Sequence, residues 1–141
     1  EQIDKLSDPD SVQLIKDTAD YIHSIGYQFT WIPYFKSSGY DTWAELGFDV
    51  ACMQPNYVFN LKAPYSNIVD CDKYTKELGM GVEMEIDSQF FDNKDYAERY
   101  YAYEKGFGEF VGKRPTAYYA GAPETMLKLA DLMTKFFNKN N

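Results

Sequence analysis

Four glycines in this chain each close a stretch of helical pattern a few residues before an apolar or aromatic run. They are Gly26, Gly47, Gly79 and Gly112. Glycine adopts the left-handed backbone conformation at a helix C-terminus without the steric cost of a Cβ, so each position is typical of a helix end. The recurrence predicts a structural unit of helix followed by strand, repeated without repetition of the sequence itself.

Apolar spacing between these glycines gives the expected order of elements. We predict helices over residues 10–25, 41–46, 70–78, 94–111 and 123–137. We predict strands over residues 27–35, 48–54, 81–87 and 116–120. Helices that alternate with strands favour a parallel sheet with right-handed crossovers, because each helix returns the next strand to the same end. We treat residues 1–9 as a lead-in and residues 10–141 as one αβ unit.

Two parallel architectures accommodate such a unit. An open doubly wound sheet that binds nucleotides lacks support, because no Gly-rich phosphate loop follows any predicted strand. The other is the (β/α)8 TIM-type barrel of about 250 residues, of which four strands are half. A half barrel leaves two strand edges open, so we expect self-association or pairing with an N-terminal half. The chain begins at Glu1 rather than Met, which fits a processed product or a piece of a longer chain.

Composition excludes several classes of function. The net charge of −8 opposes a phosphate backbone, so no nucleic-acid partner is expected. No run approaches the roughly 20 apolar residues that a membrane span needs, and no signal peptide is evident. His23 is the single histidine, and the spacing of Cys52 and Cys71 matches no zinc pattern. We therefore predict no metal and no cofactor, and no nucleophile that depends on an imidazole base within this chain, although a carboxylate-bound cation stays open.

Aromatic residues are unusually frequent. Tyr, Phe and Trp make up 18% of the chain. Rings with a polar tip suit amphipathic ligands such as sugars, although several will simply fill the core.

Candidate ligand-binding residues follow from the expected topology, because function concentrates at the C-terminal ends of parallel strands. The candidates for substrate binding are Trp31, Tyr34, Gln54, Asn56, Tyr57, Tyr118 and Tyr119. Amides would bind sugar hydroxyls and rings would stack on the apolar sugar face. Two alternatives stay open: Gln54 to Tyr57 is also ordinary turn chemistry, and Trp31 is more often a core residue than a ligand platform.

The third predicted strand alternates acidic and apolar residues. If Val82, Met84 and Ile86 pack against helices, then Glu83, Glu85 and Asp87 point into the barrel. Residues two apart lie about 6.6 Å from each other along a strand, close enough to raise one another's pKa. A carboxyl with a raised pKa suits a general acid, and glycoside hydrolysis commonly uses two carboxyls.

These acids are the predicted catalytic residues, with unequal support. Glu85 and Asp87 lie nearer the strand end than Glu83, for which a structural role is equally well supported. No other predicted strand ends in an acid, so a second catalytic carboxyl would come from outside this chain. Solvent-exposed acids on an antiparallel sheet are the alternative.

The chain resembles a bacterial family known as domain of unknown function 4855. The resemblance rests on Trp31-Ile-Pro-Tyr-Phe35, Leu46-Gly-Phe-Asp49, Gln54-Pro-Asn-Tyr57 and Gly81-Val-Glu-Met-Glu85, in this order within about residues 29 to 120. It implies a glycoside hydrolase-like barrel of an often exported, longer protein, with the present chain as its C-terminal portion. It implies a fold and a substrate class rather than a reaction.

We therefore expect a carbohydrate-active protein, similar to glycoside hydrolases, that acts on a glycan through acids at a barrel strand end. A non-catalytic glycan-binding protein is the first alternative. An inactive barrel fragment that self-associates is the second. A secreted, periplasmic or cell-surface location is implied by the resemblance alone.

Overall fold

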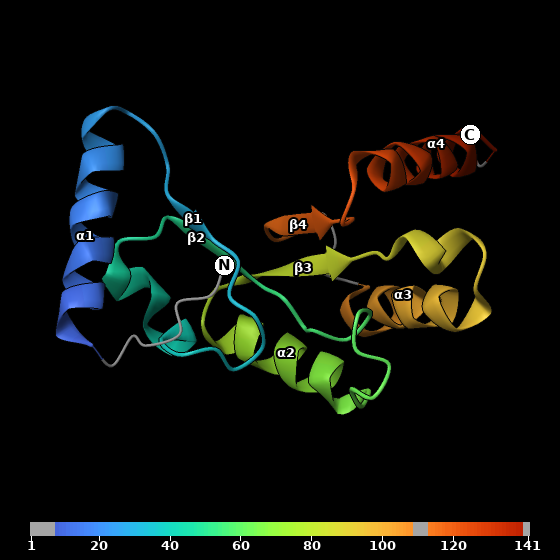
Figure 1. The fold of residues 1–141 in the computed structure, drawn as a ribbon, viewed down its shortest axis with the longest axis horizontal. Coiled ribbons are helices and arrows are strands. Elements are labelled where there is room, and N and C mark those ends of the chain that lie inside the picture. The colour runs from blue at the N-terminus through green and yellow to red at the C-terminus, as the bar shows by residue number, and fades with distance from the viewer. Residues whose placement is uncertain (1–7, 109–112, 140–141) are drawn as a thin grey trace.

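The computed structural model describes residues 8–108 and 113–139, and its helices and strands alternate along the chain (Figure 1). The α-helices are α1 (Pro9–Ser24), α2 (Ser66–Glu77), α3 (Lys94–Phe107) and α4 (Pro123–Lys139). The strands are β1 (Thr30–Trp31), β2 (Val50–Met53), β3 (Gly81–Glu85) and β4 (Thr116–Tyr119). Two 3-10 helices are η1 (Tyr40–Leu46) and η2 (Ser88–Phe91). The order of elements agrees with the sequence pattern, except that η2 was not expected.

The strands form one parallel sheet in the order β1-β2-β3-β4, curled into half of a barrel. Each strand pairs with its neighbour in sequence because each crossover advances the chain by one position. The predicted strand over residues 27–35 is much shorter in the structure, with only Thr30 and Trp31 in β1 and one isolated bridge between Tyr34 and Gln54. Pro33 lies between these pairings and has no N–H to continue the ladder.

The glycine pattern is confirmed where the structure describes it. Gly26, Gly47 and Gly79 have φ values of 82°, 92° and 65°, in the left-handed region that an L side chain disfavours. Gly112 lies outside the described residues.

The main core lies between the sheet and helices α2 and α3. Val82, Met84 and Ile86 are buried there together with Ile68 of α2 and Phe107 of α3. The alternating acids Glu83 and Glu85 are equally buried, so both faces of β3 are covered. The burial of the apolar side chains is the main favourable contribution to holding both helices against the sheet.

A second, smaller cluster lies at the α1 end of the molecule. Trp31 stacks on Phe48 with ring centroids 5.1 Å apart, and Leu46 completes the cluster. Trp31 is thus a core residue, which is the more common role of tryptophan, rather than a ligand platform.

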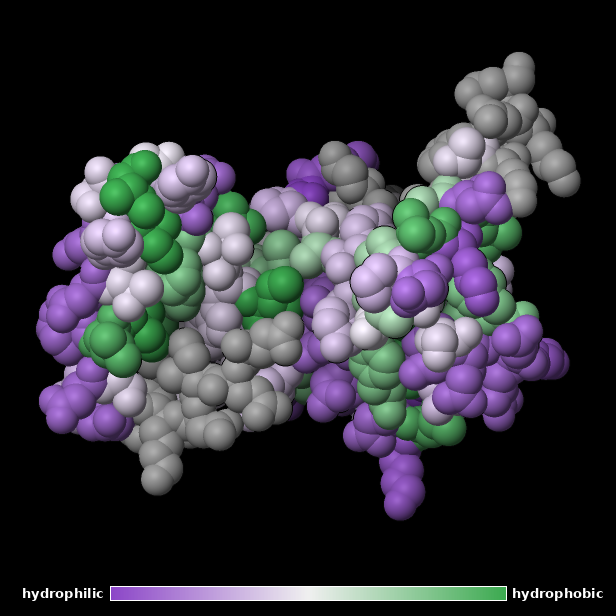
Figure 2. Space-filling view, turned by 45° about the horizontal axis from the view of Figure 1, so that its top comes forward, coloured by the Kyte–Doolittle hydropathy of each residue, from purple (hydrophilic) through white to green (hydrophobic). Residues whose placement is uncertain are grey.

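Both edges of the sheet lack a strand partner within the described residues. Apolar residues also lie at the surface of the α1 region, where Leu14 and Ile25 are more than half exposed. Figure 2 shows hydrophobic patches at the surface of the molecule. Within the same ranges, no helix has the length and apolar content needed to cross a membrane.

Candidate functional site

Glu85 ends β3, and its side chain is fully buried. Its carboxylate oxygen Oε2 accepts a hydrogen bond from the backbone N–H of Tyr57, with 3.0 Å between nitrogen and oxygen. The same oxygen accepts a hydrogen bond from the hydroxyl of Tyr103 on α3. The other oxygen, Oε1, is buried and has no hydrogen-bond partner among the described residues. The predicted acid therefore lies at a strand end, but behind other groups rather than at the surface.

The environment of Glu85 alters its acidity. Burial raises the pKa of this carboxyl above its ordinary value, because a charge is poorly solvated in the interior. The hydrogen bonds from Tyr103 and from the backbone of Tyr57 and Val58, and the charge of Arg99, oppose that shift without reversing it. A carboxyl with a raised pKa retains its proton to higher pH, as a general acid requires.

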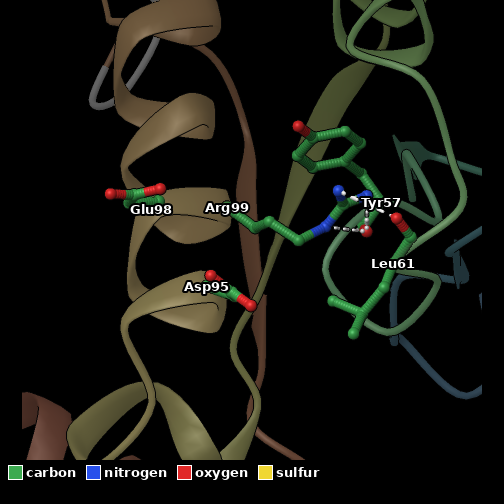
Figure 3. Close-up of a pocket in the computed structure, with 5 residues that line it drawn as sticks. All are labelled: Tyr57, Leu61, Asp95, Glu98 and Arg99. Atoms are coloured by element: carbon green, nitrogen blue, oxygen red, sulfur yellow. Dashed lines mark hydrogen bonds between the residues drawn. The ribbon is translucent and has the colours of Figure 1, made fainter.

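A loop after β2, residues 57–63, covers this carboxyl. The hydroxyl of Tyr103 accepts hydrogen bonds from the backbone N–H groups of Tyr57 (3.3 Å) and Val58 (3.1 Å). From the other side, Arg99 of α3 reaches across to the backbone carbonyls of the loop (Figure 3). The 57–63 loop is thus fixed to α3 through both its N–H and its C=O groups.

An open pocket of about 320 Å³ lies between α3 and this loop. Its lining consists of Tyr57, Leu61, Asp95, Glu98 and Arg99. A pocket of this volume is at the lower end of the range for small ligands. The guanidinium of Arg99 is engaged with the loop, so the acidic side chains are the polar groups most open to a ligand there.

Glu83 is as buried as Glu85, with 1% of its surface exposed. It lies near Cys52 of β2, whose thiol pKa is raised by burial and, to a smaller extent, by the charge of Glu83. Glu83 precedes the strand end by two residues and is farther from the rim, as the sequence order requires.

Asp87 has a clear local role. Its Oδ1 accepts a hydrogen bond from the backbone N–H of Gln89 at 2.8 Å, so it caps the N-terminus of η2. The side chain is partly exposed. This cap accounts for an acid at residue 87 independently of any catalytic role.

The residues after β1 and β2 are arranged by backbone contacts. Gln54 donates its N–H to the carbonyl of Pro33 and accepts from the N–H of Phe35, both at 2.7 Å. Asn56 is exposed and has φ of 52°, a left-handed conformation that asparagine tolerates better than most residues. Tyr34, partly buried, joins Gln54 through the isolated bridge.

Aromatic side chains gather where β4 ends. The ring of Tyr119 lies edge-on to that of Phe59 from the 57–63 loop, with centroids 5.7 Å apart. Tyr119 is 41% exposed, Phe59 is 39% exposed and the neighbouring Tyr118 is 36% exposed. Tyr119 also pairs in register with Glu85 across the β3–β4 ladder. The structure therefore brings together Glu85, Tyr57 and Tyr119 from the sequence prediction, and leaves Trp31 in the second core cluster.

Three residues of this region were missed from the sequence. Tyr103 has a ring that packs in the core, as expected for an aromatic residue of a helix, and its hydroxyl binds Glu85. No sequence pattern indicated a role for Arg99 or Phe59. For Tyr103, the only feature of the sequence that indicated a polar contact was a hydroxyl group on an otherwise apolar helix face.

Within the described parts of the chain, no group of His, Cys, Asp and Glu side chains has the arrangement of a metal site. The family model that matches the chain is described as "Domain of unknown function (DUF4855)", and the match extends over residues 1–135. Comparisons with curated proteins and with solved structures found no match.

Proposed function

We propose that this chain, which belongs to the DUF4855 family, binds a carbohydrate at the C-terminal ends of β3 and β4. The observation on which the proposal rests is the exposed pair of Phe59 and Tyr119 beside the end of β3. Aromatic faces of this kind offer apolar area with a polar edge, which matches the alternating apolar and hydroxyl surfaces of a sugar ring. The position agrees with the functional end of parallel αβ folds.

Two further features support glycan binding over other ligands. Asn56 places an exposed amide in the segment after β2, whereas Tyr118, one residue before Tyr119 on β4, points to the opposite face of the sheet. The net charge of −8 disfavours polyanionic ligands. A neutral glycan is therefore the best-supported substrate class.

Glycan-array binding, followed by titration with the best ligand, tests this proposal. Tyr119→Ala and Phe59→Ala are expected to weaken binding by about tenfold each, because each removes a stacking surface. Tyr21→Ala is a matched control, since Tyr21 is an exposed tyrosine on α1. Equal affinities for all three variants and the wild type would contradict the proposed site.

Glycoside hydrolysis is the second candidate function, and the environment of Glu85 favours it. Its carboxyl has a raised pKa, and one oxygen has no hydrogen-bond partner in the described structure. In this case Glu85 is the acid or nucleophile and Glu83 or Asp87 tunes its pKa. The side chains of Gln54, Asn56 and Tyr57 position the sugar hydroxyls. The 57–63 loop would have to open for substrate to reach Glu85, because the side chain is fully buried.

Turnover measurements separate the two functions. Glu85→Gln should abolish hydrolysis of a responsive glycan while preserving the fold, whereas Glu45→Gln at an exposed position should not. Full activity of Glu85→Gln would remove this residue from the mechanism. Binding without product formation on any glycan would leave the non-catalytic function.

We also propose that the open edges of the half barrel are covered in the functional assembly, by a second copy or by a further half barrel. In the part of the chain that the structure describes, β1 and β4 each have one edge without a strand partner, and α1 exposes apolar residues; both features support this proposal. A mass measurement in solution tests self-association of this chain. The proposal of an exported protein rests on the family resemblance and is tested by fractionation of cells.

A further inference from the structure

Arg99 makes an unusual set of contacts for a half-buried surface residue. Its guanidinium donates hydrogen bonds to the backbone carbonyls of Tyr57 (2.9 Å from Nε), Asn60 (2.8 Å), Ala63 (3.1 Å) and Leu61 (3.5 Å). The Cζ atom also lies 3.5 Å from the centroid of the Tyr57 ring. One side chain of α3 thus binds four carbonyls of a loop that follows β2, and Figure 3 shows it extending from the helix to that loop.

These contacts divide the 57–63 loop into two anchored parts. Tyr103 and Glu85 hold its first N–H groups, those of Tyr57 and Val58. The contacts of Arg99 from Asn60 to Ala63 hold its second part. Phe59 lies between the two anchors, and its ring contacts Tyr119.

We infer that Arg99 is a positioning residue that sets glycan affinity by fixing the 57–63 loop, and thereby holding Phe59 against Tyr119. The inference rests on the proposed glycan-binding function and adds to it a residue that does not itself touch the ligand. Removal of Arg99 frees four carbonyls and the second anchor, while the anchor formed by Tyr103 and Glu85 stays in place. The aromatic pair then loses its fixed separation, because Phe59 lies on a loop whose second part no longer binds α3.

The geometry requires arginine at this position. A guanidinium presents five donors in a planar fork and stacks on an aromatic ring, whereas the ammonium of lysine is a single point charge. Lysine at residue 99 would keep the charge and the aliphatic stem, yet it could not bind carbonyls on both sides of the loop at once.

Arg99→Lys is therefore the diagnostic variant, and Arg114→Lys is its matched control. Arg114 is also partly buried and donates to the carbonyl of Met80 at 3.4 Å, near the start of β3. Arg99→Met, which keeps the stem but has no donors, serves as a second variant. Amide hydrogen exchange measures the loop without any ligand, and titration with the best glycan from the array measures affinity.

We expect exchange of the Lys62 and Ala63 amides, which donate to Asn60, to accelerate about tenfold or more in Arg99→Lys, because the charge-assisted hydrogen bonds that hold this part of the loop are lost. Affinity for the glycan should fall by about tenfold through the same loss of order. Arg99→Met should show at least the same changes, and Arg114→Lys should show neither.

Unchanged exchange in both Arg99 variants would overturn the inference, because the loop would not depend on this residue. Faster exchange with unchanged affinity would also overturn it, while leaving the proposed function intact. A wild-type protein that binds no glycan would overturn the proposed function and, with it, the role of Arg99 in binding.

Discussion

The hydroxyl of Tyr103 donates a hydrogen bond to the carboxylate of Glu85 and accepts two from the backbone of the 57–63 loop. One phenol thus joins α3, the end of β3 and the segment after β2. Since all of these groups are buried, each needs its partner, and loss of one partner leaves the others unsatisfied.

Tyr103→Phe tests the energetic importance of this junction. The substitution keeps the ring but removes the hydroxyl, so the N–H of Val58 loses its acceptor and Glu85 loses a donor. We expect the free energy of unfolding to fall by about 1–3 kcal/mol, measured by urea denaturation. Tyr101→Phe, at an exposed tyrosine of α3, should change it by less than about 0.5 kcal/mol. Equal values for both variants would show that the buried hydroxyl adds no stability.

Glu85 should also give stability a defined pH dependence. Its pKa is raised in the folded state from an ordinary value of 4.5, so its contribution is most favourable below pH 4.5 and is lost as pH rises through the folded pKa. Glu85→Gln cannot ionise, so its stability relative to the wild type should increase with pH over this interval. Urea denaturation at a series of pH values measures the difference.

The control for this measurement is Glu45→Gln, because Glu45 is an exposed glutamate. The difference between that variant and the wild type should show no comparable rise. A Glu85→Gln curve parallel to that of the wild type would mean that Glu85 keeps its unfolded-state acidity.

Gly47 combines a positive φ with close packing. A Cβ at this position would lie 2.6 Å from the Cβ of Ala19 on α1, whereas at Gly26 it would meet nothing within 4 Å. Both glycines have left-handed φ, so Gly26→Ala should cost about 1–2 kcal/mol from the backbone alone. Gly47→Ala should cost a further ~1–3 kcal/mol from overpacking, seen as a lower denaturation midpoint. Equal losses would show that α1 moves aside freely.

Asp49 connects α1 to the segment before β1. Its Oδ2 accepts hydrogen bonds from the backbone N–H of Phe29 (2.7 Å) and from Nε2 of His23 (2.8 Å). Both hydrogen bonds lower the pKa of the Asp49 carboxyl, and the one from Phe29 has the larger effect. A lowered pKa adds stability above the ordinary value of 3.8 that is lost as pH falls through the folded pKa. Asp49→Asn should therefore be less stable than the wild type at pH 7, and the difference should shrink in acid.

Asp20→Asn, an exposed aspartate of α1, provides the comparison for Asp49 and should show little difference at either pH. Thermal unfolding at neutral and acidic pH measures both variants. A difference for Asp49→Asn that stays constant in acid would assign its effect to packing rather than to charge.

Much of the fold followed from local patterns. The glycines at 26, 47 and 79 end their helices as expected, and Val82, Met84 and Ile86 are buried in the main core. Strand length was less predictable, since an aromatic run before Pro33 has the composition of a long strand but forms only two residues of one. The number of ladder bonds depends on the neighbouring strand as well as on the run itself.

The candidate site was only partly predictable. A strand-end acid was expected at residue 85 and is found there, but its complete burial was not expected. The tyrosine that binds it is 18 residues farther along the chain, and the loop that covers it is 28 residues before it. Nothing in the alternation of β3 refers to either partner.

The sequence by itself determined the repeating helix and strand units, their parallel arrangement and the acid at the end of β3, because glycine conformation and side-chain periodicity act over a few residues. Only the tertiary structure decided the surroundings of that acid, which is enclosed by Tyr103 and the 57–63 loop. Arg99 holds this loop, and Phe59 of the loop contacts Tyr119. The physical reason is the distance along the chain over which each effect acts. A carboxyl's exposure and pKa depend on groups brought together from distant segments, and those contacts exist only once the helices have packed on the sheet.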